Sequence, residues 1–140
     1  MDERKIDQVV YELKRYQVVV AALQETKWFG SDMYTVGDSV VLTSGRVVPE
    51  QEGSRQKGEG IAVVLSGSAV SAWKAGGSQW KAWSSRLMRV SLKIRSRPCD
   101  QLHVLSCYAP TFVACRDEKN AFFNSLQQVI LEILLSPLLS

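Results

Sequence analysis

The strongest constraint on the fold is a nearly continuous apolar run, Tyr16–Leu23, that passes directly into Gln24 and Glu25. Valine and alanine dominate this run, which is typical of a β-strand that is covered on both faces. A carboxylate placed directly after such a strand is held by a rigid element and still reaches the rim of the sheet. Ligand sites of open α/β sheets lie at such strand ends, so Glu25 is the first candidate for a functional residue.

Further strand patterns follow along the chain. Tyr34–Val36 and Ser39–Thr43 predict two short strands, and the apolar segment Gly60–Leu65 predicts a buried one. Arg86–Arg95 alternates apolar and polar residues, and we expect it to pair antiparallel with Leu102–Tyr108. Together these strands predict a mixed, mostly antiparallel sheet.

Two helices are expected to flank this sheet. Residues 2 to 15 carry apolar side chains at helical spacing, and Asp2 is placed to cap the first turn. The second helix is expected to begin at Asp117 and to be broken by Ser136-Pro137. The order of elements predicts an α/β fold in which helices cover at least one face of the sheet.

Two stretches between these elements have weaker patterns. Residues 45 to 60 are polar and glycine-rich, and we expect an exposed loop. Ser66–Ser85 is expected to be a bent strand with a hairpin at Gly76-Gly77. Its three tryptophans are expected to anchor the core or a loop, and stacking on nucleic-acid bases is the alternative. They are Trp73, Trp80 and Trp83.

Composition narrows the class of protein. A chain of 140 residues, 46% hydrophobic and 22% charged, corresponds to one globular domain and not to a disordered or fibrous chain. It opens without a signal-peptide pattern, and no apolar stretch is long enough to cross a bilayer. An intracellular location, nucleus or cytoplasm, is therefore expected. The three cysteines lack the spacing of a zinc site; they are Cys99, Cys107 and Cys115.

Positive charge is concentrated in one interval of the chain. No acidic residue lies between Glu59 and Asp100. Such an interval fits a polyanionic partner such as nucleic acid, and a solvated strand surface is the alternative. Its basic residues are Lys74, Lys81, Arg86, Arg89, Lys93, Arg95 and Arg97.

Few side chains are candidates for catalysis or for binding a metal ion or a phosphate. Glu25 is a candidate ligand for a hard divalent cation, and the alternative is a surface carboxylate paired with Lys27. Tyr108 ends a predicted strand and is placed to contact a phosphate oxygen with its phenol. Thr111 would help to hold that phosphate in position. The alternative is a buried tyrosine bonded to backbone. His103, the only histidine, lies in mid-strand and is interpreted as structural.

Several segments, in order along the chain, resemble those of the endonuclease/exonuclease/phosphatase superfamily, which has the DNase-I-like fold. The strongest is Leu23–Trp28, with the sequence LQETKW. The others are Gly60–Ser66, Ser85–Val90, Leu102–Thr111 and Asp117–Gln128. The closest likeness is to endonuclease domains of non-LTR retrotransposons and to the craniofacial-development-protein-2-like group derived from them.

The resemblance implies a fold, a reaction and a set of site residues. The fold would be a partial DNase-I-like α/β sandwich, and the reaction Mg²⁺- or Mn²⁺-dependent hydrolysis of phosphodiester bonds in DNA. By this resemblance Glu25 would be a metal ligand and Tyr108 a catalytic contact near the scissile phosphate. Lys27 and Thr111 would lie around the substrate phosphate.

The family pattern also extends beyond the residues matched here. Three parts of the family pattern have no counterpart in residues 1–140. They are the first strand, which carries a metal-site Asn, the strand that ends in Gly-Asp-Phe-Asn, and the Ser-Asp-His motif. We therefore expect a single partial domain over 1–140 with little or no nuclease activity. One alternative is a non-catalytic remnant that binds nucleic acid weakly through its basic face. Another is a truncated product without a settled role, whose exposed sheet edges need a complementing partner chain.

Overall fold

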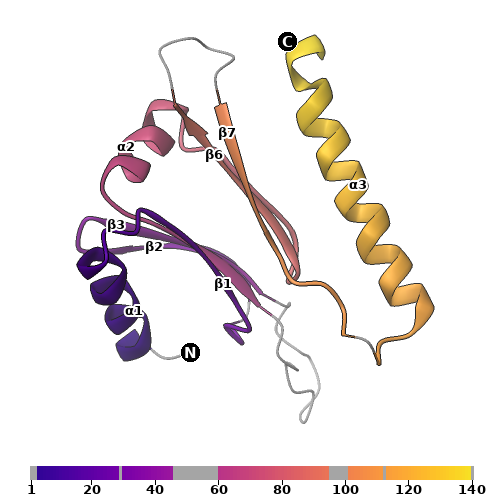
Figure 1. Cartoon of the computed structure of the whole chain (residues 1–140), viewed down its shortest axis with the longest axis horizontal. Coiled ribbons are helices and arrows are strands. Elements are labelled where there is room, and N and C mark those ends of the chain that lie inside the picture. Colours follow the sequence, from indigo (N-terminus) through magenta and orange to yellow (C-terminus); the bar gives the residue numbers. More distant parts are fainter. Residues whose placement is uncertain (1–2, 29, 46–59, 95–100, 112, 140) are drawn as a thin grey trace.

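The computed structural model describes residues 3–28, 30–45, 60–94, 101–111 and 113–139. Within these ranges the chain forms three helices and seven strands (Figure 1). The elements are, in order, α1 (Glu3–Arg15), β1 (Val20–Gln24), β2 (Ser31–Val36), β3 (Ser39–Ser44), β4 (Ile61–Leu65), α2 (Ser68–Ala75), β5 (Trp80–Ser84), β6 (Leu87–Lys93), β7 (Gln101–Cys107) and α3 (Arg116–Leu139). The Asp2 cap, Cys99 and most of the loop expected at residues 45 to 60 lie outside the described residues.

The strands form two sheets and not the single mixed sheet that was predicted. The first has the order β1-β4-β3-β2, and the second has the order β5-β6-β7. Every pairing in both sheets is antiparallel. Short connections explain this, because a turn such as Gly37-Asp38 joins antiparallel neighbours whereas parallel strands need a long crossover. The two short strands, the buried strand β4 and the antiparallel pairing of β6 with β7 are confirmed.

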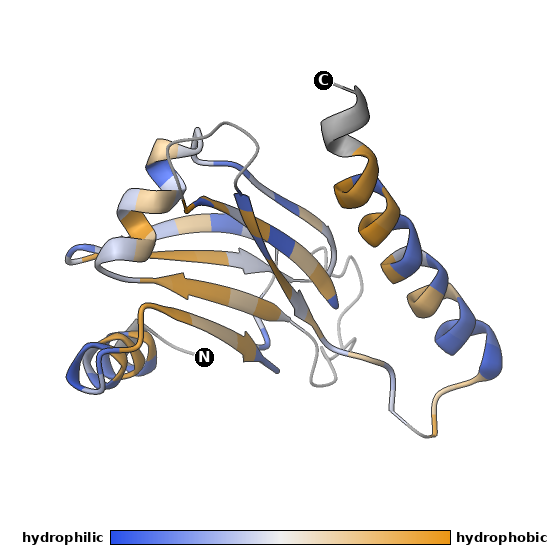
Figure 2. Cartoon of the chain, turned by 45° about the horizontal axis from the view of Figure 1, so that its top comes forward, coloured by the Kyte–Doolittle hydropathy of each residue, from blue (hydrophilic) through white to orange (hydrophobic). Residues whose placement is uncertain are grey.

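Two hydrophobic clusters set the order of the layers. One fills the space between the sheets, where Leu42, Val63 and Met88 are each 0% exposed. The other lies between the first sheet and α1, whose Ile6 and Val10 pack on the opposite face. Figure 2 shows the hydrophobic side of α1 turned toward the strands. The layers therefore run α1, first sheet, second sheet and α3 (Figure 1).

Strand β1 lies at an edge of the first sheet. In the described chain it pairs with β4 alone, and Val19 just before it is 41% exposed. The prediction of a strand covered on both faces is wrong for β1, and the prediction of a buried strand is right for β4. Strand β3, which was predicted only as a short strand, is also buried throughout. The valine content of a strand does not show whether one face or both faces are covered, because an edge strand that packs on a helix through one face has a similar composition.

The predicted bent strand over Ser66–Ser85 is wrong in its first half, which is helix α2. The Gly76-Gly77 pair ends this helix and does not form a hairpin. Gly77, at φ +93°, donates its N–H to the Lys74 carbonyl, and Ser78 donates to the Trp73 carbonyl at 2.9 Å. These are the two bonds of a Schellman motif, which places glycine in the left-handed region after a helix.

Helix α3 is longer than expected. It continues through Pro137 to Leu139, so the predicted break at Ser136-Pro137 is wrong. With two residues after it, Pro137 removes one hydrogen bond but interrupts no later turn. Phe122 and Val129 are buried, whereas the apolar side chains of Phe123, Ile130 and Leu134 are exposed. No helix in the described ranges has the length and apolar character needed to cross a membrane.

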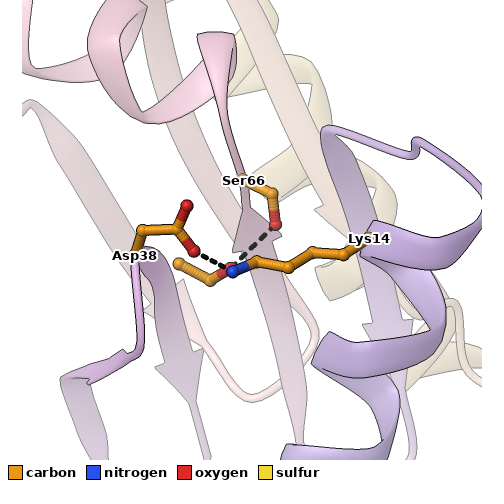
Figure 3. A network of polar contacts seen from close by, with 4 residues as sticks. Lys14, Asp38 and Ser66 are labelled. Atoms are coloured by element: carbon orange, nitrogen blue, oxygen red, sulfur yellow. Dashed lines mark hydrogen bonds and ion pairs between the residues drawn. The ribbon is translucent and has the colours of Figure 1, made fainter.

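The end of α1 is tied to the turn between β2 and β3. Lys14 forms an ion pair with Asp38 in this turn (Figure 3). Beside it the hydroxyls of Ser39 and Ser66 form a buried hydrogen bond of 2.9 Å. These contacts hold the end of the first sheet that is opposite to Glu25.

Candidate functional site

The backbone turns sharply directly after β1. Glu25 and Lys27 have φ angles of +57° and +63°, in the left-handed region that side chains other than glycine rarely adopt. Between them, Thr26 is 1% exposed, and its N–H donates to the Gly60 carbonyl at 3.0 Å. Such backbone strain persists only where surrounding contacts impose it, and it is common at functional sites.

The carboxylate of Glu25 contacts the second sheet. The Tyr108 phenol donates a hydrogen bond of 2.5 Å to Glu25 Oε1, across 83 positions of sequence. Next to it, the Gln24 amide donates to the Cys107 carbonyl at 2.5 Å. These two contacts join the end of β1 to the end of β7. The two candidates picked from the sequence therefore lie in one site, formed where the two sheets meet.

Arg86 completes the group. Its Nη1 donates to the Tyr108 carbonyl at 3.1 Å, and its guanidinium carbon lies 5.1 Å from the centre of the Tyr108 ring. The Tyr108 N–H in turn donates to the Arg86 carbonyl at 2.8 Å. A guanidinium on one side of the tyrosine and a carboxylate on its hydroxyl fix the phenol ring in place. The sequence indicated Arg86 only as one member of the basic interval.

Gly60 connects the two sides of the site through its backbone. Its carbonyl accepts from Thr26, and its N–H donates to the Ser85 carbonyl at 3.2 Å. Its φ angle of +102° is open to glycine and strained for any other residue. Below it, the Ser44 hydroxyl donates to the Ser84 carbonyl at 2.5 Å. The turn that carries Glu25 and the segment that carries Arg86 are therefore held by the same residue.

We expect Gly60→Ala to loosen the site and to destabilise the fold by about 1–3 kcal/mol, since it forces a side chain into a strained conformation. Gly37→Ala is a matched control, because Gly37 also has a positive φ, +61°, but lies in the β2–β3 turn. Amide hydrogen exchange and urea unfolding measure the two effects. Exchange at the Thr26 amide should rise more in Gly60→Ala than in the control. Equal exchange in both variants would contradict this role of Gly60.

The other two predicted contacts lie near the pair without touching it. Lys27 is exposed and, among the described residues, forms no ion pair with Glu25, so the alternative of a Glu25–Lys27 pair is wrong. Thr111 is exposed, and its carbonyl accepts from the Ala114 N–H at 3.0 Å. The Tyr108 hydroxyl donates to the Glu25 carboxylate, whereas the alternative interpretation expected a hydroxyl bonded to backbone.

His103 and Cys107 are structural in character. Ser91 Oγ and His103 Nδ1 form a hydrogen bond of 2.9 Å across the β6–β7 pair, a partner that sequence spacing did not reveal. Burial, with the charge of Arg89 nearby, lowers the pKa of His103 below its ordinary value. Burial raises the pKa of the Cys107 thiol, which keeps it protonated and unreactive. Neither side chain reaches Glu25 through a contact in the described chain.

A hollow of about 380 Å³ opens beside Arg86, between the second sheet and the start of α3. It places a second carboxylate, Glu118, on the rim of the same region. Arg86, which contacts Tyr108, is the residue that the hollow shares with the Glu25–Tyr108 site. Its lining residues are Ser84, Arg86, Leu87, Pro110, Glu118, Ala121, Phe122 and Ser125.

The residues present fit a divalent cation only in part. Mg²⁺ takes oxygen ligands and is commonly held by one or two carboxylates together with substrate phosphates and water. Glu25 supplies one carboxylate, and one of its oxygens already accepts from Tyr108. Within the described ranges no group of three or more His, Cys, Asp or Glu side chains is arranged to hold a metal ion. The site therefore offers one protein ligand to a cation that a bound phosphate would have to help retain.

Comparisons with known proteins identify no relative. A scan against protein-family models, a search of curated proteins and a search of solved structures found no match. The family likeness of this chain therefore depends on the sequence motifs from Leu23–Trp28 onward.

Proposed function

We propose that the chain is a phosphodiester-binding domain of the endonuclease/exonuclease/phosphatase type, related to enzymes that cleave DNA with a divalent cation. The observation that carries the proposal is the 2.5 Å hydrogen bond between Tyr108 and Glu25. Two residues 83 positions apart, each chosen from a strand end, meet where the two sheets join. A DNase-I-like arrangement of sheets would require this meeting, and the two facing antiparallel sheets between helices are compatible with it.

Each side chain has a distinct part in the proposed site. Arg86 offers a guanidinium that can donate to phosphate oxygens while it remains fixed against the Tyr108 ring. Tyr108 has one phenolic hydrogen, which it donates to Glu25 in this structure, and it would donate to a phosphate oxygen once Glu25 binds the cation. A bound Mg²⁺ or Mn²⁺ would supply charge stabilisation at the phosphate and the leaving oxygen, with Glu25 as its protein ligand. Lys27 and Thr111 lie on the exposed rim, where a DNA backbone would pass.

A second candidate function is nucleic-acid binding without catalysis. The small number of acidic ligands favours this function. In the described chain Glu25 is the one carboxylate that is hydrogen-bonded to Tyr108 in the site. Hydrolysis needs groups that orient the attacking water and fix the coordination of the metal. Arg86 and Tyr108 can donate hydrogen bonds to a phosphate, but with one carboxylate they do not fix a metal ion and orient the attacking water.

We expect the 140-residue chain to nick supercoiled plasmid DNA at or near the background rate in Mg²⁺, since its site has too few ligands for turnover. The assay compares the chain with Glu25→Ala, in Mg²⁺ and in a chelator. Mg²⁺-dependent nicking that Glu25→Ala abolishes would contradict the expected inactivity and would establish the enzymatic reading.

Binding tests the proposal separately from turnover. Tyr108→Phe should weaken binding to duplex DNA by about fivefold, the effect of losing a hydrogen bond of about 1 kcal/mol. Tyr16→Phe is the matched control, because Tyr16 is 69% exposed and lies at the end of α1. Anisotropy in Mg²⁺ measures both affinities, and equal affinity of the two variants would show that the Glu25–Tyr108 pair is not part of the binding site.

A further inference from the structure

A cluster of two cations and a tryptophan lies on strands β5 and β6. Lys81 and Arg89 are directly opposite each other in the antiparallel register. The tryptophan, Trp83, lies at a β-bulge that shifts the register between Ala82 and Ser84. Lys81 Nζ is 4.9 Å and the Arg89 guanidinium carbon is 5.7 Å from the centre of the Trp83 ring. We refer to these three residues as the Lys81–Trp83–Arg89 cluster.

This cluster faces away from the first sheet. Trp80 and Ala82, which alternate with its members along β5, pack against the core between the sheets. Lys81 is exposed, and the other two side chains are half-buried. The β-bulge is informative because bulges redirect a side chain and are frequent beside functional sites. Here the redirected side chain is the ring that both cations contact.

The positive charge of the cluster is not neutralised within the described chain. Neither Lys81 nor Arg89 forms an ion pair with a carboxylate among the described residues. Like charges directly opposite each other on paired strands are destabilising. Arg89 Nε is in addition buried without a hydrogen-bond acceptor. An unpaired donor on a half-buried guanidinium is a cost that an anion bound at this charge would offset.

We propose that the Lys81–Trp83–Arg89 cluster binds a backbone phosphate of a nucleic-acid strand. Arginine and lysine are the usual donors to phosphate oxygens, and aromatic rings among cations are typical of surfaces that follow a single strand. Among the described residues no hydrogen bond, ion pair or ring contact joins the cluster to the Glu25–Tyr108 pair, so this proposal does not depend on the proposed phosphodiesterase function. It extends the surface for nucleic acid onto the face of the second sheet that is turned away from the first sheet, the side on which α3 lies (Figure 1).

The test measures binding of a short, fluorescently labelled oligothymidylate in a chelator over a series of salt concentrations. Lys81→Gln should lower the steepness of the plot of log affinity against log salt by about 0.7, the value for one lost phosphate contact on a single strand. Lys74→Gln is the matched control, because Lys74 is an exposed lysine on α2, outside the cluster. Lys81→Arg, which keeps the charge, should restore the slope.

Further binding measurements identify the ligand and distinguish this proposal from the proposed phosphodiesterase function. An oligomer with an uncharged methylphosphonate backbone should bind far more weakly, and Glu25→Ala should leave the effect of Lys81→Gln unchanged. Equal slopes for Lys81→Gln and Lys74→Gln would overturn the proposal. So would inorganic phosphate that displaces the strand at equal phosphate concentration, since that result indicates a site for a free anion. Loss of binding in Glu25→Ala alone would overturn it while leaving the proposed function in place.

Discussion

Leu42→Ala should destabilise the protein by about 2–5 kcal/mol, a large part of the stability of a domain of this size. Leu42 lies in the centre of β3 and is 0% exposed, in the cluster between the two sheets. Its removal leaves a cavity that the surrounding strands cannot close, because β3 is paired on both sides with β2 and β4. Urea unfolding followed by circular dichroism measures the loss.

The matched control is Met33→Ala. Met33 is the residue directly opposite Leu42 in the β2–β3 register, but it is 51% exposed. Its truncation should change stability by about 0.5 kcal/mol or less, as for most exposed positions. A similar loss in both variants would mean that the space between the sheets is not the main core of the protein.

The strand content of the fold could be predicted from the sequence because it depends on local patterns. Arg86–Arg95 alternates, and its Met88, Val90 and Leu92 are buried as their spacing indicated, whereas Ile94, the next residue of the same alternation, is 55% exposed. The division into two sheets could not be predicted, since it depends on which edges pair. Helix α2 was missed because it is eight residues long, and because a glycine pair signals a hairpin as readily as the end of a helix.

The site was predictable in part for the same reason. Glu25 and Tyr108 are each placed by a strand that ends beside them, which is a local property. Their contact depends on how β1 and β7 lie across the two sheets, and no sequence pattern encodes that. Arg86 was visible only as a basic residue, because its contact with the Tyr108 ring follows from the β6–β7 register. The resemblance to known motifs predicted related roles for Glu25 and Tyr108, whereas the spacing of the two residues in the sequence did not.

The two surfaces proposed for nucleic acid lie on the same sheet. Arg86 precedes β6, and Arg89 lies within that strand, three residues further on. At about 3.3 Å per residue, this places the two guanidinium-bearing positions about 10 Å apart along the strand. One nucleic-acid strand is long enough to reach both. Mutations at Lys81 and at Tyr108 should therefore weaken binding independently of each other, since the two contacts share no partner.

Trp73 shows how α2 contributes to this arrangement. It is 3% exposed in the cluster between the sheets, and its Nε1 donates to the Gln79 carbonyl at 3.2 Å. The same carbonyl accepts from the Ser91 N–H at 3.1 Å. One tryptophan thus packs the helix against the core and also fixes the start of β5 against β6, the two strands that carry the Lys81–Trp83–Arg89 cluster.

Trp73→Ala should therefore cost about 3–5 kcal/mol of stability, the usual range for removal of a buried aromatic side chain. Trp73→Phe keeps most of the packing but loses the bond to Gln79, so it should cost less, with about 1 kcal/mol from the hydrogen bond. Trp83→Phe is the control, since Trp83 is half-buried on the outer face. Urea unfolding of the three variants measures the order. If Trp73→Ala were no more destabilising than Trp83→Phe, α2 would not be packed into the core, and the interpretation of Gly76-Gly77 as a helix end would fail with it.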